Sequence, residues 1–169
     1  MKNIILIGMP GCGKSTVGVL LAKAIGFGFV DTDLLICEHE NTTLQDIIDT
    51  KGVDELLKIE GIVGKELSVK NTVVATGGSM VFSDEAMQNL SKHGVIVFID
   101  VSLKELESRI KNLESRGIAM KNGETLETVY NQRMPKYRHY ADITVHAHSY
   151  NSIEDVVEKI KIKLARHSQ

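Results

Sequence analysis

Hydrophobic positions along the chain alternate between short unbroken runs and longer stretches with helical spacing. Residues 3–8 begin with one asparagine and are otherwise an unbroken apolar run, which is typical of a parallel strand buried on both faces. Over residues 15–24 the apolar positions recur every three or four residues, which predicts an amphipathic helix that ends at Gly26. Further short apolar runs predict strands at residues 27–30, 72–75, 95–99 and 143–145.

The segments between these runs have the spacing of helices. Ser102 and Glu105 form a capping box that opens one of them. Other helices are predicted at residues 42–50, 54–70, 125–138 and from residue 152 onward. Because strands alternate with helices, we expect a three-layer α/β/α fold around a mainly parallel five-stranded sheet. No linker or internal repeat divides the sequence, so residues 1–169 are expected to form a single domain.

Composition narrows the class of protein. Hydrophobic residues make up 43% of the chain and charged residues 25%, which excludes a disordered chain. The formal net charge of -2 gives no reason to expect nucleic acid or an anionic membrane as a partner. No apolar run approaches the roughly 20 residues of a membrane span. Two cysteines, Cys12 and Cys37, suit reduced thiols in the cytoplasm, where we expect the protein to act as a monomer.

A phosphate-binding motif lies between the first strand and the first helix. Residues 8–15, Gly-Met-Pro-Gly-Cys-Gly-Lys-Ser, match the pattern G-x-x-x-x-G-K-[ST] in the strand and helix context that the pattern requires. Its glycines let backbone N–H groups surround phosphate oxygens, Lys14 would reach the β- and γ-phosphates, and Ser15 would ligate Mg²⁺. A bound nucleotide is therefore expected at Gly11, Cys12, Gly13, Lys14, Ser15 and Thr16.

Other classes of phosphate-loop protein fit the sequence less well. The N-K-x-D motif that reads guanine in GTPases does not occur. A chain of 169 residues is also short for a motor or transporter ATPase. A kinase that uses ATP and Mg²⁺ to phosphorylate a small molecule remains the best interpretation.

Five segments in order along the chain together resemble the shikimate kinase family. They are the phosphate loop, Asp31-Thr32-Asp33, Thr76-Gly77-Gly78, Arg116, and Arg133-Met134-Pro135-Lys136-Tyr137. The resemblance implies a P-loop fold like that of nucleoside-monophosphate kinases. It also implies ATP-dependent phosphorylation of a hydroxyl on a small carboxylated metabolite, namely shikimate to shikimate 3-phosphate.

The resemblance also implies roles for individual residues. Asp33 would bind the acceptor hydroxyls and help to deprotonate the attacking one, while Asp31 would hold Mg²⁺ through water together with Ser15. Lys14, Asp33 and Arg116 would be the catalytic residues, with Arg116 on a mobile lid at about residues 112–123.

Further residues would bind the acceptor and the adenine. Arg133 would clamp the acceptor carboxylate, and Arg109 would lie near the adenine. The turn formed by Gly77, Gly78 and Ser79 would contact the acceptor, and a helical segment at about residues 33–61 would enclose it.

Three positions depart from the family pattern. The family places an arginine in G-E-x-x-F-R-x-x-E to grip the acceptor carboxylate, and Leu57 stands there in this chain. Ser79 replaces the third glycine of the acceptor turn, and the lid reads Arg-Gly-Ile-Ala, residues 116–119, where the family has R-P-L-L. Two alternatives therefore stay open: a kinase of the same fold for another hydroxylated metabolite, and a non-catalytic relative that only binds nucleotide.

Overall fold

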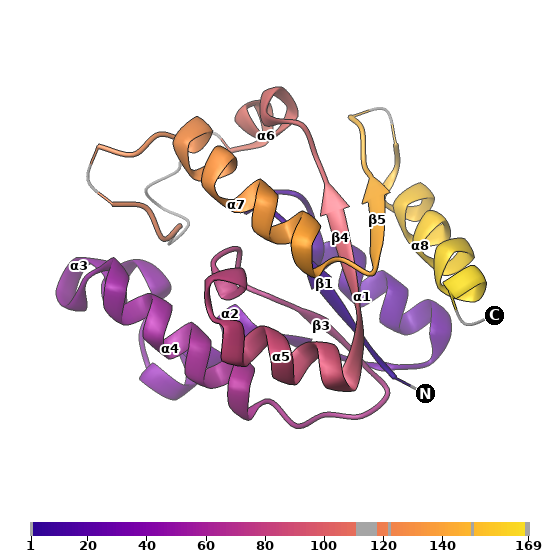
Figure 1. Cartoon of the computed structure of the whole chain (residues 1–169), viewed down its shortest axis with the longest axis horizontal. Helices are drawn as coiled ribbons and strands as arrows, with labels where there is room; N and C mark the ends of the chain where they lie inside the picture. The colour runs from indigo at the N-terminus through magenta and orange to yellow at the C-terminus, as the bar shows by residue number, and fades with distance from the viewer. Residues whose placement is uncertain (1, 111–117, 122, 150, 168–169) are drawn as a thin grey trace.

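Five strands form one sheet in which each neighbouring pair is parallel, as the sequence predicts (Figure 1). The computed structural model describes residues 2–110, 118–121, 123–149 and 151–167. The order of the strands across the sheet is β2-β3-β1-β4-β5. The strands are β1 (Asn3–Ile7), β2 (Gly28–Asp31), β3 (Thr72–Ala75), β4 (Gly94–Asp100) and β5 (Ile143–His146).

The central strands are buried on both faces. Every residue of β1 and of β3 is buried, and these strands consist largely of isoleucine, valine and leucine. Such residues suit a parallel strand that is covered from both sides. In β1, Leu6 pairs with Ala75 of β3 on one side and with Val97 of β4 on the other. The loops that follow β1 and β3 therefore start next to each other at one edge of the sheet.

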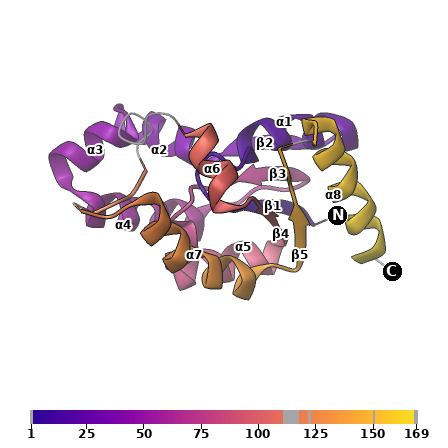
Figure 2. The same cartoon turned by 90° about the horizontal axis from the view of Figure 1, so that it is seen from above.

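Helices cover both faces of the sheet, which confirms the three-layer prediction. Helices α1 (Lys14–Ile25) and α8 (Ile153–His167) lie on one face, and α5 (Asp84–His93) and α7 (Leu126–Tyr140) lie on the other (Figure 2). The short helix α6 (Leu103–Arg109) follows β4. Buried apolar residues from these helices and from the strands form one large core.

Three more helices form a separate layer beside the sheet, at the left in Figure 1. They are α2 (Thr32–Glu40), α3 (Leu44–Lys51) and α4 (Val53–Glu66). Their apolar faces meet in a second, smaller cluster built on Ile36, Ile47, Leu56 and Ala119. This layer therefore has a core of its own, and it occupies the region in which the sequence predicts the acceptor-binding helical segment.

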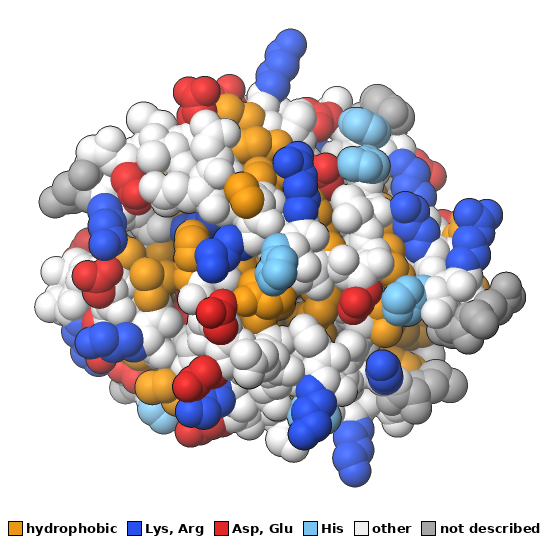
Figure 3. All heavy atoms as spheres, in the orientation of Figure 1, with side chains coloured by type: hydrophobic (Ala, Val, Ile, Leu, Met, Phe, Trp, Pro, Cys, Tyr) orange, Lys and Arg blue, Asp and Glu red, His pale blue; other side chains and the backbone are white. Residues whose placement is uncertain are grey.

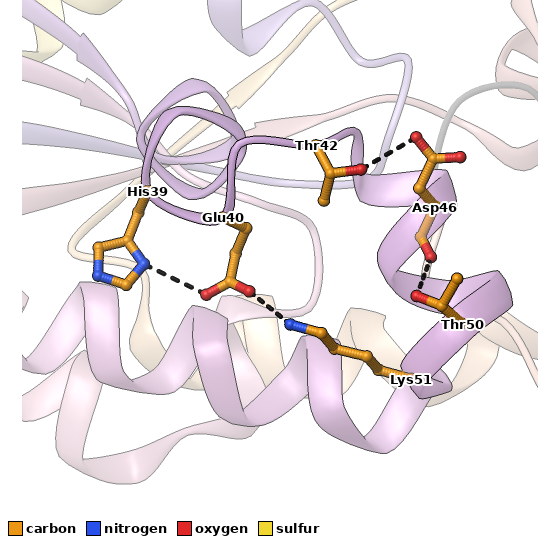
Figure 4. A network of polar contacts seen from close by, with 6 residues as sticks. All are labelled: His39, Glu40, Thr42, Asp46, Thr50 and Lys51. Carbon is orange, nitrogen blue, oxygen red and sulfur yellow. Dashed lines mark hydrogen bonds and ion pairs between the residues drawn. The ribbon is translucent and has the colours of Figure 1, made fainter.

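Polar contacts at the surface hold the turn between α2 and α3 (Figure 4). Lys51 Nζ at the end of α3 lies 2.6 Å from Glu40 Oε2 at the end of α2. Asp46 accepts hydrogen bonds from the hydroxyls of Thr42 and Thr43, at 3.1 and 2.7 Å. The bond to Lys51 lowers the pKa of Glu40, and the bond from Thr43 lowers the pKa of Asp46. Both carboxyl groups are thus held as anions that close the turn.

Two helices differ from the sequence-based predictions. Helix α5 was not predicted, although Ser83 caps it and Ala86, Met87 and Leu90 pack into the core. Its other residues are polar, so its apolar face is short. The prediction that the helix beginning near residue 54 continues to residue 70 is wrong, because α4 ends at Glu66. Leu67 has extended backbone angles and packs against the large core.

Charged side chains of both signs are interspersed over the face seen in Figure 3, and neither sign forms a large patch there. Among the residues that the structure describes, no helix is long and apolar enough to cross a membrane.

The buried side chain of Asn3 joins the starts of β1 and β3. Its Nδ2 donates to the Val69 carbonyl at 2.8 Å, and its Oδ1 accepts from the Thr72 N–H at 3.1 Å. We expect Asn3→Ala to lower the free energy of unfolding by roughly 2 kcal/mol or more, because it leaves two backbone groups without partners. Urea unfolding measures the change. Asn131→Ala, at an exposed position of α7, is the control, and equal effects at the two sites would contradict this account.

Candidate functional site

A cavity of about 580 Å³ opens at the carboxyl ends of the strands. This is the edge where ligands bind in open parallel α/β sheets. The phosphate loop lines one end of the cavity, and residues from α2, α4, α7 and the turn after β3 line the other. The polar residues of the wall are Lys14, Ser15, Thr16, Asp33, Glu60, Thr76, Ser79, Arg109 and Arg133.

The phosphate loop begins where β1 ends and leads directly into α1. Gly11 and Gly13 have φ angles of 79° and 100°, in the left-handed region that favours glycine. Helix α1 starts at Lys14, so the positive end of its dipole and its free N–H groups face the cavity. Lys14 Nζ donates to the carbonyls of Gly8 and Met9 at 2.7 and 3.0 Å. The loop thus presents a cation and backbone amides to the same space.

The two residues expected to hold Mg²⁺ lie next to each other. Ser15 Oγ donates to Asp31 Oδ2 at 2.5 Å, although the residues are sixteen positions apart in sequence. The other oxygen of Asp31 accepts from the N–H of Asp33 and caps α2. A hydroxyl and a carboxylate beside a phosphate loop suit Mg²⁺, which keeps several waters and also binds substrate phosphates. The donor set of this chain therefore fits the ion.

The turn after β3 is fastened to its neighbours by its backbone. Thr76 donates twice to the Leu6 carbonyl of β1, from its N–H at 3.2 Å and from its hydroxyl at 2.9 Å. The N–H of Gly77 donates to Thr32 Oγ1 at 3.0 Å. A side chain at Gly77 would overlap the carboxyl groups of Asp33 and Glu60, so glycine is needed there for close approach. Gly77 thus supports the wall, whereas Gly78 and Ser79 line the cavity.

Asp33, at the start of α2, points an unpartnered oxygen into this region. Its Oδ1 is buried and has no hydrogen-bond partner among the described residues. Burial, with a smaller effect from the nearby Asp31, raises the pKa of Asp33 to about 6, and Lys14 opposes both effects. Asp33 is therefore mostly ionised at neutral pH and available as a hydrogen-bond acceptor.

Arg133 of α7 faces the same end of the cavity. It is 2% exposed, and its Nη2 donates to the Ala119 carbonyl at 2.6 Å. Its guanidinium carbon lies 5.9 Å from the centre of the Phe82 ring, within range of a cation–π contact. Its Nε is buried without a partner among the described residues. Ala119 and Phe82 thus hold a planar cation whose Nε–H group has no partner among the described residues.

Glu60 belongs to the site, although it was not among the predicted site residues. It is 3% exposed on α4 and lines the cavity, and the Ser79 hydroxyl donates to its Oε2. Burial raises the pKa of Glu60 to about 7. The signal was present in the sequence, because Glu60 lies at helical spacing between Leu56 and Gly64 on the buried face of α4. A glutamate at a core position is rare without a partner or a function.

The structure places the other predicted residues as follows. Arg109 lines the cavity next to the phosphate loop. The side chain of Cys12 is buried, and Cys12 is not part of the described wall. Leu57 packs against the smaller cluster of α2, α3 and α4. Of the predicted lid, residues 112–117, which include Arg116, and residue 122 lie outside the described residues, whereas Ile118 and Ala119 border the cavity.

Together these groups define a class of protein. A lysine-bearing phosphate loop at one end of a cavity faces a carboxylate and a guanidinium at the other, which is the arrangement of a phosphate-loop kinase that acts on a small molecule. The chain belongs to the shikimate kinase family, whose model matches residues 10–165. This family consists of ATP-dependent kinases.

The relatives of this chain include a shikimate kinase and a longer protein of another name. The chain is 36% identical to a shikimate kinase from Sulfurihydrogenibium sp. over 171 residues, which covers 98% of this chain and 99% of that protein. It is also 31% identical to Threonine synthase-like 1 of Homo sapiens, a match that covers 98% of this chain and 23% of that protein.

A solved structure supports the same fold. The shikimate kinase from Acinetobacter baumannii in complex with shikimate superposes with a TM-score of 0.87 at 27% identity. The match covers 98% of this chain and 94% of that one.

Folding raises the pKa of Glu60 from 4.5 to about 7, so ionising this residue costs about 3 kcal/mol of stability. The stability that the neutral form of Glu60 provides is fully present below pH 4.5 and is lost as the pH rises through about 7. Between about pH 5 and pH 8.5 the melting temperature of Glu60→Gln should therefore fall less than that of the parent. Glu127→Gln, at an exposed position of α7, is the control. Parallel melting curves for Glu60→Gln and the parent would show that Glu60 does not titrate in this range.

Proposed function

We propose that this protein transfers the γ-phosphoryl group of ATP to the 3-hydroxyl of shikimate. The observation that carries the proposal is the pair of unpartnered buried atoms, Asp33 Oδ1 and Arg133 Nε, at one end of the cavity. The first is a hydrogen-bond acceptor suited to a hydroxyl, and the second is a cationic donor suited to a carboxylate. A small hydroxylated carboxylate such as shikimate satisfies both.

The phosphate loop supplies the other half of the reaction. Its backbone N–H groups and Lys14 would hold the β- and γ-phosphates of ATP. Ser15 and Asp31 would hold Mg²⁺, directly and through water, and the bound ion would neutralise phosphate charge. Gly11, Cys12, Gly13 and Thr16 would complete the nucleotide site, and the position of Arg109 on the wall supports a role near the adenine.

At the acceptor end, alignment of the hydroxyl contributes more than base strength. Phosphoryl transfer has a loose transition state, so catalysis depends mainly on in-line positioning and on neutralising charge. Asp33 would accept the proton of the attacking hydroxyl at Oδ1, and the nearby Lys14 favours the ionised form that does so. Arg133 would fix the carboxylate, with Gly78 and Ser79 forming the wall beside it and Gly77 supporting that wall.

The remaining assignments are part of the same proposal. Arg116 would stabilise the transferring phosphoryl group from a lid at about residues 112–123, whose closure would exclude water. We also propose that the single domain acts as a monomer in the cytoplasm. Cys12 and Cys37 are free thiols, which suits a reducing compartment.

A kinase of the same fold for a different hydroxylated metabolite is the second candidate. Leu57 favours it, because the family has an arginine at this position to grip the acceptor carboxylate. ADP release should be measured with shikimate, quinate, nucleoside monophosphates and other polyols. Saturable turnover with shikimate is the expected result, whereas turnover only with another acceptor supports the second candidate. Nucleotide binding without acceptor-stimulated turnover would indicate a non-catalytic relative.

Lys14→Ala should lower kcat at least about 100-fold, because it removes the cation that would hold the β- and γ-phosphates. Lys23→Ala, on the last turn of α1, should leave kcat unchanged.

Two arginines of α7 allow a matched test of the acceptor clamp. Arg133 is buried in the cavity wall, whereas Arg138 is exposed. We expect Arg133→Ala to raise the KM for shikimate about 10- to 100-fold, because a charged hydrogen bond contributes about 1.5 to 3 kcal/mol. Arg138→Ala should leave it unchanged, and the KM for ATP should change in neither variant. A normal KM for shikimate in a folded Arg133→Ala protein would place the carboxylate elsewhere.

A further inference from the structure

A second buried carboxyl group, that of Glu60, lies at the acceptor end of the cavity beside Asp33. The Ser79 hydroxyl donates to Glu60 Oε2, and both side chains are more than nine-tenths buried. Glu60 Oε1 and Asp33 Oδ1 both approach the α-carbon of Gly77, where a side chain would collide with each of them. Two carboxyl groups therefore converge under one turn, next to the site of a carboxylated acceptor.

One anionic and two cationic side chains act on the ionisation of Glu60. Asp33 of α2 opposes ionisation of Glu60, while Arg133 of α7 and Lys14 of the phosphate loop favour it. Both cations bind other groups in the proposed reaction, because Lys14 would bind the phosphates of ATP and Arg133 would bind the acceptor carboxylate. The Ser79 hydroxyl favours the anion as well, but it carries no charge.

Several other charged groups on the neighbouring helices pair away from Glu60. Helix α4 packs against α2, α3, α5 and the short 3-10 helix Met80–Phe82. On α5, Glu85 pairs with Lys65 near the far end of α4, at 2.7 Å. On α3, Lys51 pairs with Glu40, and Lys136 of α7 lies over the Phe82 ring of the 3-10 helix.

The helix that carries Glu60 also lacks a cation on the side facing the smaller cluster. Leu57 lies three residues before Glu60, at the spacing of side chains that interact on one helix face. It packs against the cluster of α2, α3 and α4 instead of carrying a charge. The next residue, Lys58, pairs with the exposed Glu55 at 3.2 Å. In this chain the uncharged Ser79 hydroxyl contacts Glu60, and position 57, one helical turn earlier, carries no charge.

We propose that Glu60 makes the binding of a carboxylated acceptor depend on protonation, and that Ser79 and Leu57 set the pH at which binding weakens. The neutral acid admits the anionic acceptor beside Arg133. The ionised form repels the acceptor and competes with it for the guanidinium. Burial places the pKa of Glu60 at about 7, so both forms are present near neutrality. This inference rests on the proposed function, because it requires a carboxylated acceptor.

The experiment is a pH profile of steady-state kinetics with shikimate and saturating ATP. In the parent protein the KM for shikimate should rise above about pH 7, by up to about tenfold for each pH unit if only the neutral form of Glu60 binds. The carboxylate of the acceptor titrates far below this range, as ordinary carboxyl groups do. The KM for ATP serves as the internal control and should not follow the same profile.

Three variants give results of different sign. In Glu60→Gln the KM for shikimate should be independent of pH, because the amide does not ionise. In Ser79→Ala the rise should move to higher pH, since the lost hydroxyl favours the anion. In Leu57→Arg the rise should move to lower pH and become smaller, because the new guanidinium pairs with the anion and offsets its charge. A purely structural role for these residues would change the melting temperature and kcat without moving the midpoint.

Failure of this inference is separable from failure of the proposed function. If the parent protein does not turn over shikimate at any pH, the proposed function is wrong. If it turns over shikimate with a KM that is flat across the range, or if Glu60→Gln keeps the dependence of the parent, only the role of Glu60 is overturned. Melting temperatures of the three variants establish that each is folded before its kinetics are compared.

Discussion

The whole site depends on the adjacency of two buried parallel strands. Strands β1 and β3 pair along their length, and Thr76 fastens the turn after β3 to the last part of β1 with two bonds to one carbonyl. The phosphate loop leaves β1 at this point, so a donor site and an acceptor wall start within one strand spacing of each other. In-line transfer needs such closeness, and the backbone supplies it before any side chain takes part.

The two ends of the cavity solve different electrostatic problems. The phosphate end collects positive potential from Lys14, backbone amides and the start of α1, which suits a polyanion. Among the described residues the acceptor end is mixed, with one guanidinium and two carboxyl groups whose pKa values are raised mainly by burial. A site of this kind favours a molecule that brings both a negative group and hydroxyls, because neither an anion nor a neutral polyol alone matches it.

Local motifs in the sequence predict the sheet and the phosphate loop well. The strands are short apolar runs, and residues 8–15 carry the loop between a strand and a helix, so period and spacing are sufficient there. The role of Glu60 was missed, although this residue stands at the last glutamate of the family pattern G-E-x-x-F-R-x-x-E. The structure shows that the buried face of α4 includes Glu60 itself.

Other features depend on contacts between distant segments, which spacing along the chain does not reveal. The predicted role of Ser79 was a substituted glycine in a turn, and only the fold brings its hydroxyl to Glu60, nineteen residues earlier. Helix α5 has only three buried apolar residues, Ala86, Met87 and Leu90, and the packing of this face against α4 and the core stabilises it. Tertiary contacts decide such cases, and a single sequence does not display them.

The burial of Glu60 has a consequence for the evolution of this protein. An ionised acid in the wall makes the folded chain less stable as conditions become alkaline, so selection for heat tolerance alone would favour its replacement. The same replacement would alter how the cavity discriminates among metabolites. In the proposed role of Glu60, stability at high pH and substrate choice therefore make opposite demands on this one position.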